Sequence, residues 1–185
     1  MKFKGAIIAI SCLLFMSTVA IAQNGKSVSP TKNQTTDQAI LQLGKPKNWV
    51  NDNEKIFTEA QIKNLSTLIR NFEARTGIEI AIATIPSTLV NTAQFDSFTL
   101  AIANSWGVGK KGKDNGILIG LSRSLRKIRI NNGYGIEKLI TDQETKQLIS
   151  DYFISNFKEG NYYEGTLQGL TALQKLLDTK IKKRH

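Results

Sequence analysis

The sequence predicts an α/β fold, a three-layer α/β/α sandwich in which helices cover both faces of a small mixed sheet. Three observations lead to this prediction. Segments with apolar residues at helical spacing alternate with short segments that have the pattern of strands. The segment from Ile78 to Ile85 is apolar on both of its faces, as in a strand that is covered on two sides. The composition, 41% hydrophobic and 22% charged, is that of a globular protein.

The N-terminus has the three-part pattern of a secretory signal peptide. A short basic start precedes an apolar run from Ala6 to Ile21, and Ala20-Ile21-Ala22 offers a small-x-small cleavage site. We therefore predict a signal peptide over residues 1–22 and an exported protein, periplasmic or secreted. Two alternatives remain. One is a transmembrane anchor, although the run is shorter than the roughly 20 residues that span a bilayer. The other is a lipoprotein modified at Cys12.

Charge and residue counts limit the chemistry of the mature chain. The sequence carries 25 Lys and Arg against 15 Asp and Glu, a net charge of +10, with one Cys and one His. Cleavage after Ala22 would remove the cysteine, and the histidine is the last residue, His185. We therefore expect no thiol chemistry, no His-bearing triad and no His metal cage. No later apolar segment reaches membrane length, so we expect no transmembrane helix in the mature chain.

Composition divides the rest of the chain into three parts. Residues 23–45 are rich in Ser, Thr, Gln, Asn and Lys, which predicts a flexible polar leader. Residues 46–179 carry the apolar periodicity, and we expect one α/β domain there. Residues 180–185 form a basic tail that we expect to fray.

The first half of this domain has the pattern of a helix, a strand and a second helix. Thr58, with Gln61 three residues later, forms a capping box that starts the first helix, and Gly77 ends it. The strand of residues 78–85 follows. Apolar residues at helical spacing then predict a helix over residues 95–106.

The second half begins with a loop rich in Gly and Lys, residues 107–116. It leads into the strands Ile117–Leu121 and Lys127–Ile130, which we expect to pair as an antiparallel hairpin. A second capping box at Thr141–Glu144 starts another helix, and the last helix covers residues 162–177. The first two strands bracket a helix, so we expect them to be parallel.

Acidic and amide side chains stand at the junctions between these elements. Asp114-Asn115-Gly116 offers a carboxylate and an amide oxygen, hard donors that suit Ca²⁺ or Mg²⁺. One Asp cannot hold such an ion alone, so partners would have to come from the segment Asn51–Glu54, from Glu137 or from Asp142. The alternative is that these residues only stabilise turns and helix starts, as they do in many proteins without any ligand.

Other kinds of binding are less well supported. The loop 107–116 superficially resembles a phosphate-binding loop, but it follows a helix and opens a strand, the reverse of the P-loop order. We therefore exclude nucleotide binding there. Arg123, Arg126, Lys127 and Arg129 on the predicted hairpin could contact anionic lipid, phosphate or an acidic partner. Interleaved aromatic residues are absent from this hairpin, so we expect no nucleic-acid partner.

Five ordered motifs between Val50 and Leu177 resemble the TPM domain family. They are Val50-Asn51-Asp52, Thr76-Gly77, Ser105–Gly109, Asp114–Leu118 and Gly133–Glu137, the last followed by Leu139–Asp142. The family includes bacterial secreted or membrane-tethered proteins and a plant thylakoid-lumen protein. The resemblance implies an α/β/α sandwich, binding of a divalent cation in loops at one end of the sheet and, for some members, a proposed acid phosphatase activity.

Residue by residue, the resemblance implies the following ligands for one Ca²⁺ or Mg²⁺ ion: Asp52, Asp114, Asn115, Glu137 and Asp142. We therefore expect an exported domain that binds a divalent cation and a protein or envelope partner. The alternative is a metal-assisted phosphatase that hydrolyses phosphate monoesters. The sequence shows no nucleophile motif, so catalytic residues and enzymatic activity stay open, as does the oligomeric state.

Overall fold

Four strands form one mixed sheet in the order β1-β2-β3-β4. β1 (Val50–Asp52), β2 (Glu79–Thr84) and β3 (Gly116–Ser122) are parallel, and β4 (Lys127–Asn132) is antiparallel to β3. The structure is a computed structural model that describes residues 36–183. Leu121 lies opposite Ile128, which confirms the predicted hairpin. The predicted signal peptide and its alternatives lie outside the described residues.

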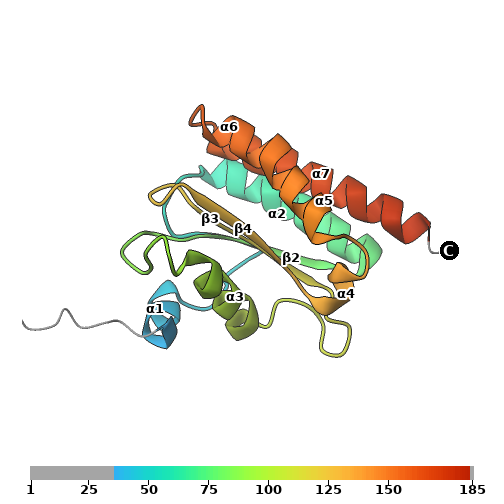
Figure 1. Cartoon of the computed structure of the whole chain (residues 1–185), viewed down its shortest axis with the longest axis horizontal. Coiled ribbons are helices and arrows are strands. Elements are labelled where there is room, and N and C mark those ends of the chain that lie inside the picture. The colour runs from blue at the N-terminus through green and yellow to red at the C-terminus, as the bar shows by residue number, and fades with distance from the viewer. Residues whose placement is uncertain (1–35, 184–185) are drawn as a thin grey trace, which may run out of the picture. The chain divides into compact units, whose positions relative to one another are not determined.

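Helices cover both faces of this sheet, so the predicted α/β/α sandwich is confirmed (Figure 1). One face carries α2 (Glu59–Thr76), α5 (Asp142–Leu148) and α7 (Tyr162–Lys182), and the other carries α1 (Thr36–Leu43) and α3 (Phe95–Trp106). Successive side chains in a strand point to opposite faces. In β2, Ile80 and Ile82 therefore join the core under α2 and α7, whereas Ala81 and Ala83 join the core under α1 and α3.

Local sequence signals set the ends of these helices as predicted. At the start of α2, Gln61 N donates to Thr58 Oγ1 at 3.3 Å, and Thr58 N donates to Gln61 Oε1 at 2.8 Å. The same reciprocal pair forms between Thr141 and Glu144 at the start of α5. Gly77 follows α2 with a φ of 73°, the left-handed conformation that favours glycine.

Helix α1 is a correction to the flexible leader that we predicted for residues 23–45. Thr36–Leu43 is helical, and three of its residues are buried against α3: Ala39, Ile40 and Leu43. Trp106 Nε1 at the end of α3 donates to Gly44 O at 3.0 Å, which fixes the end of α1. The second half of the predicted leader is therefore part of the folded structure.

The chain between α5 and α7 contains a π-helical turn, η1 (Ile149–Ile154), followed by the short helix α6 (Ser155–Phe157). A Cβ at Gly169 would overlap the Phe153 ring of η1, and a Cβ at Gly165 would lie 2.7 Å from the Phe157 ring. The two glycines of α7 thus permit the close approach of η1 and α6 to α7. Among the described helices, none is long and apolar enough to cross a membrane.

Candidate functional site

The predicted cation ligands lie at two opposite ends of the sheet. Asp52 ends β1 and so lies at the carboxyl end of the parallel strands. Asp114 and Asn115 precede β3, at the other end of the same strands. Because β4 is antiparallel to β3, Glu137 and Asp142, which follow β4, lie toward the Asp114 end. The expected convergence of all five residues on one ion is therefore wrong for Asp52.

The Asp52 carboxylate organises the turn between β1 and α2. Its Oδ1 accepts a hydrogen bond from Thr84 Oγ1, and its Oδ2 accepts one from Phe57 N, both at 2.8 Å. Thr84 Oγ1 in turn accepts a hydrogen bond from Glu54 N at 2.8 Å. Both carboxylate oxygens of Asp52 are thus engaged within the protein, as expected for a residue that stabilises a turn.

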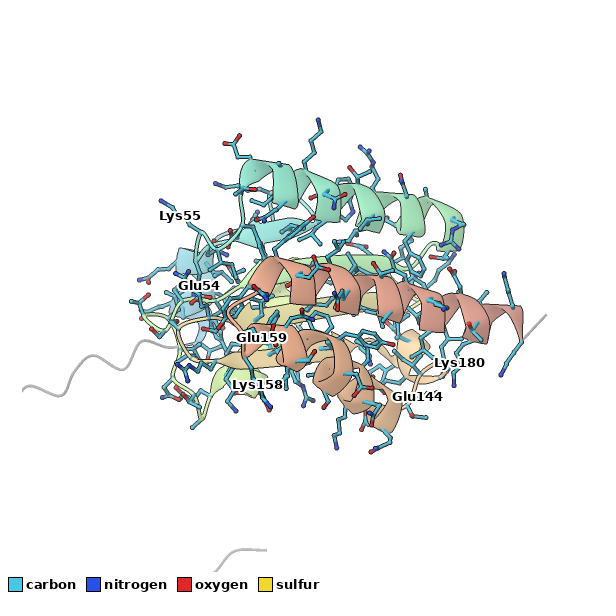
Figure 2. All side chains as sticks on the ribbon, turned by 90° about the horizontal axis from the view of Figure 1, so that it is seen from above. Glu54, Lys55, Glu144, Lys158, Glu159 and Lys180 are labelled. Atoms are coloured by element: carbon cyan, nitrogen blue, oxygen red, sulfur yellow. The ribbon has the colours of Figure 1, made fainter. Side chains whose placement is uncertain are left out.

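Glu54, considered in the sequence only as a member of the segment Asn51–Glu54, holds the β3–β4 turn at this same end (Figure 2). Its Oε2 accepts a hydrogen bond from Arg123 N at 2.7 Å. Its Oε1 accepts from Ser124 Oγ at 2.7 Å and from Ser124 N at 3.1 Å. The turn lies 69 residues along the chain from Glu54, so no local pattern could have revealed this role.

The D-N-G and G-Y-G-x-E motifs meet at the other end of the sheet. Gly133 N donates to Gly116 O, and Gly135 N donates to Asp114 O, both at 2.9 Å. A Cβ at Gly133 would overlap the Asp114 carbonyl oxygen, and a Cβ at Gly135 would overlap that of Lys113. Neither glycine has a positive φ. Glycine is therefore needed at both positions for close backbone approach and not for a positive φ.

The side chains at this end differ in whether they form hydrogen bonds within the protein. Asn115 is engaged in its own loop, because its Nδ2 donates to Gly77 O at 2.6 Å and its Oδ1 accepts from Lys110 N at 2.9 Å. The carboxylates of Asp114, Glu137 and Asp142 make no hydrogen bond or ion pair within residues 36–183. Both ends of the Asn115 amide are thus used within the protein, whereas the carboxylates of these three acids are available.

The buried amide oxygen of Asn132 is a further candidate metal ligand, which was not predicted from the sequence. Asn132 Nδ2, at the end of β4, donates to Thr145 Oγ1 at 3.1 Å, and Asn132 Oδ1 is buried without a partner among the described residues. A buried acceptor without a partner is energetically costly. An amide oxygen is also a ligand for hard cations. Asn132 Oδ1 is therefore a candidate ligand toward the Asp114 end.

The candidate ligands do not form a dense cluster. In the part of the chain that the structure describes, no group of three or more Asp, Glu, His and Cys side chains is close enough to hold a metal ion. A cation at the Asp114 end would therefore be bound by fewer than three acidic side chains, and main-chain carbonyls and water would complete its coordination.

Glu144, near the same end, is fixed in an ion pair (Figure 2). Lys180 Nζ lies 2.5 Å from Glu144 Oε1, and Thr141 N donates to Oε2 at 2.9 Å. The hydrogen bond from Lys180, followed by that from Thr141 N, lowers the pKa of Glu144 from 4.5 to about 2. This carboxylate is thus ionised but committed to α7, which leaves Asp142 as the available acid at the start of α5.

Comparison with known protein families identifies the domain. The family model described as the TPM domain matches residues 50–176, well over half of the chain. The chain belongs to the TPM domain family. The matched TPM region contains both ends of the sheet and all five predicted ligands, and it begins after α1.

Solved structures agree with the TPM assignment. The N-terminal domain of a protein from Porphyromonas gingivalis is 31% identical, with a TM-score of 0.68, and the match covers 80% of this chain and 94% of that one. BA42 from Bizionia argentinensis is 21% identical, with a TM-score of 0.58 and coverage of 69% and 86%. The N-terminal domain of cg2496 from Corynebacterium glutamicum is 15% identical, with a TM-score of 0.51 and coverage of 70% and 79%. The last two show the fold alone. No curated protein matches the chain.

Proposed function

We propose that this TPM domain is an exported, non-enzymatic binding domain that holds Ca²⁺ or Mg²⁺ at the Asp114 end of the sheet. One observation carries the proposal. The hydrogen bond from Gly135 N to Asp114 O fastens the G-Y-G-x-E segment to the D-N-G segment. It therefore brings the segment that ends in Glu137 against the backbone of Asp114, and neither carboxylate is engaged with another described residue.

The donor chemistry at this end suits a hard cation. Asp114 and Glu137 supply carboxylates, and Asn132 Oδ1 adds an unpaired amide oxygen. Asp142, at the start of α5, is an alternative to one of these two acids and not a third acid on the same ion. Because fewer than three acids can reach one ion together, we expect weak binding, with a Kd on the order of 10⁻⁴ to 10⁻³ M, as in extracellular calcium modules.

An exposed aromatic residue supports a role in protein or envelope contacts. Tyr134 lies between Gly133 and Gly135, and 74% of its surface is exposed. Exposed tyrosines are frequent anchors of protein interfaces, since the ring contributes apolar area and the hydroxyl a hydrogen bond. A cation held beside this ring would place a positive charge and an aromatic surface on the same face.

The phosphatase alternative requires further features at the Asp114 end of the sheet, in addition to a bound cation. A metal-assisted hydrolase needs a cation with an open water position and positive groups that steady the phosphate. The exposed lysines of the loop 110–113 lie at the Asp114 end, whereas Arg126 in the β3–β4 turn lies at the opposite end. No described contact favours hydrolysis over binding, so hydrolysis is an outcome of the test.

A ¹H–¹⁵N NMR titration with Ca²⁺ and Mg²⁺ tests the proposal. We expect saturable shifts in residues 114–116 and 133–137, and their loss in the double variant Asp114→Asn with Glu137→Gln. Asp52→Asn, at the opposite end, is the matched control and should keep the shifts. Absence of saturable shifts at millimolar cation would overturn the cation site.

A phosphate-monoester assay in the same buffer separates binding from catalysis. We expect no turnover with the cation bound. Hydrolysis that depends on the cation and disappears in Asp114→Asn would replace the binding role with the phosphatase.

A further inference from the structure

A cavity of about 580 Å³ lies between the β3–β4 turn and the segment that joins α6 to α7. Ser122 and residues 126–128 line one side of the cavity, and residues of η1, α6 and the start of α7 line the other. This is the carboxyl end of the parallel strands, opposite the Asp114 end. The cavity is therefore separate from the proposed cation site.

One part of the cavity lining is apolar. It consists of Ile128, Ile149, Ile154, Phe157 and Tyr162. Four of these side chains pack on the edge of the larger core but are only partly buried, and Ile154 is 36% exposed. Ile149 and Ile154 are the first and last residues of η1, and π-helical turns are frequent at functional sites. Apolar surface left open to water in this way would be covered favourably by an apolar ligand.

Three of the remaining five lining residues are positively charged, and the other two are Ser122 and Gly160. Arg126, Lys127 and Lys158 line the cavity, and no acidic residue does. Within the described part of the chain, these three side chains make no ion pair and no hydrogen bond. The nearby Glu159 carboxylate instead accepts a hydrogen bond from Asn161 Nδ2 at 3.3 Å. Three unpaired like charges around one cavity favour an anion there.

A second large hollow has no comparable preference. A groove of about 810 Å³ between α5, η1 and α7 is lined by Glu144, Asp151 and Glu164 together with Lys175. Its charges have both signs, and Glu144 is already paired with Lys180. Of these two hollows, the cavity beside Arg126 has the lining that specifies a class of ligand.

We propose that this cavity binds an amphiphilic anion, a molecule with one carboxylate or phosphate head and an acyl body. The head lies among Arg126, Lys127 and Lys158, where its charge meets unpaired cations. The acyl body covers Ile128, Ile154 and Phe157. The cavity volume lies within the roughly 300–1,000 Å³ of small-molecule sites.

Arg126 offers a variant that removes a charge without straining the fold. Its backbone has a φ of 53°, in the left-handed region where glycine is favoured and a side chain is strained. Arg126→Gly therefore keeps the turn conformation, and we expect the variant to be at least as stable as the wild type in urea unfolding. Lys158→Ala removes a second charge from the other side of the cavity.

The test is a ¹H–¹⁵N NMR titration of the protein with decanoate and with decyl phosphate, both below their micelle concentrations. We expect saturable shifts at Ile128, Ile154 and Tyr162 with at least one of the two probes. Arg126→Gly and Lys158→Ala should each weaken binding roughly threefold to tenfold, the loss expected for one charge-assisted contact. Arg70→Gln on the exposed face of α2, outside the cavity lining, loses the same charge and should bind as the wild type does.

Two further probes decide which part of the ligand matters. Inorganic phosphate that shifts the same residues with equal affinity would show a free-anion site and overturn the amphiphile. Decanol that binds as tightly as decanoate would overturn the role of the three cations. Absence of saturable shifts with both decanoate and decyl phosphate, or an equal loss of affinity in Arg70→Gln and Arg126→Gly, would overturn the site itself.

Discussion

Glu144 at the start of α5 and Lys180 near the end of α7 form an ion pair, with 2.5 Å between Oε1 and Nζ (Figure 2). The pair connects two helices on the same face of the sheet. α7 continues to Lys182, so residues 180–182 are helical, which corrects the first part of the frayed tail predicted for residues 180–185. The first residue of the predicted tail thus has a structural partner.

This pair predicts a pH-dependent contribution to stability. The pKa of Glu144 is lowered on folding from 4.5 to about 2, chiefly by Lys180. A carboxyl group with a lowered pKa stabilises the fold above its unfolded pKa, and this contribution is lost as the pH falls from about 4.5 toward 2. Since the pair lies at the surface, we expect only about 0.2–1 kcal/mol at neutral pH.

Glu144→Gln tests this contribution because glutamine preserves the capping box. In urea unfolding at neutral pH, the variant should be less stable than the wild type by that amount. The difference should vanish when both proteins are measured near pH 2. A difference of equal size at both pH values would show that the charge of Glu144 is not its source.

Gly169 predicts a packing effect that outweighs helix propensity. Alanine is favoured over glycine inside a helix by about 1 kcal/mol. A Cβ at Gly169, however, would overlap the fully buried ring of Phe153, and overpacking of this kind costs about 1–3 kcal/mol. We therefore expect Gly169→Ala to lower the free energy of unfolding. The double variant Gly169→Ala with Phe153→Leu should recover part of the lost free energy of unfolding. If Gly169→Ala alone were more stable than the wild type, the close contact between Gly169 and Phe153 would be wrong.

The hydrogen bonds of Asp52 predict that this carboxylate contributes to the stability of the fold and not to cation binding. In Asp52→Asn, the amide nitrogen cannot accept one of the hydrogen bonds that Thr84 Oγ1 and Phe57 N now donate. We expect a loss of about 1–3 kcal/mol in urea unfolding. Asp142→Asn, at a side chain with no hydrogen bond in the described structure, should change stability much less. If Asp52→Asn were as stable as the wild type, the structural role of this carboxylate would be wrong.

Most of the fold could be predicted because its signals are local. Capping boxes at Thr58 and Thr141, glycine at position 77 and the apolar patterns of β2 and β3 act within a few residues of the chain. α1 and β1 were missed for the opposite reason. A three-residue strand is defined by its pairing with β2, and α1 has only three buried residues in polar surroundings.

The candidate site was harder to predict because it depends on topology. Asp52 ends a strand and Asp114 precedes a strand that runs parallel to it, so the two must lie at opposite ends of the sheet. Recognising Val50–Asp52 as a strand would have shown this from the sequence. The bonds of Glu54 to the β3–β4 turn, by contrast, join segments 69 residues apart and required the structure.

Helix α1 supplies the last prediction. A helix of eight residues is marginal alone, so its order depends on packing against α3. Ile40 is 9% exposed in that contact, whereas its neighbour Leu41 is 79% exposed. Ile40→Ala should therefore abolish hydrogen-exchange protection in residues 40–44 while leaving β2 and β3 protected, because α1 opens locally. Leu41→Ala is the matched control and should leave the protection intact. Equal effects of the two substitutions would show that α1 is not held by its buried face.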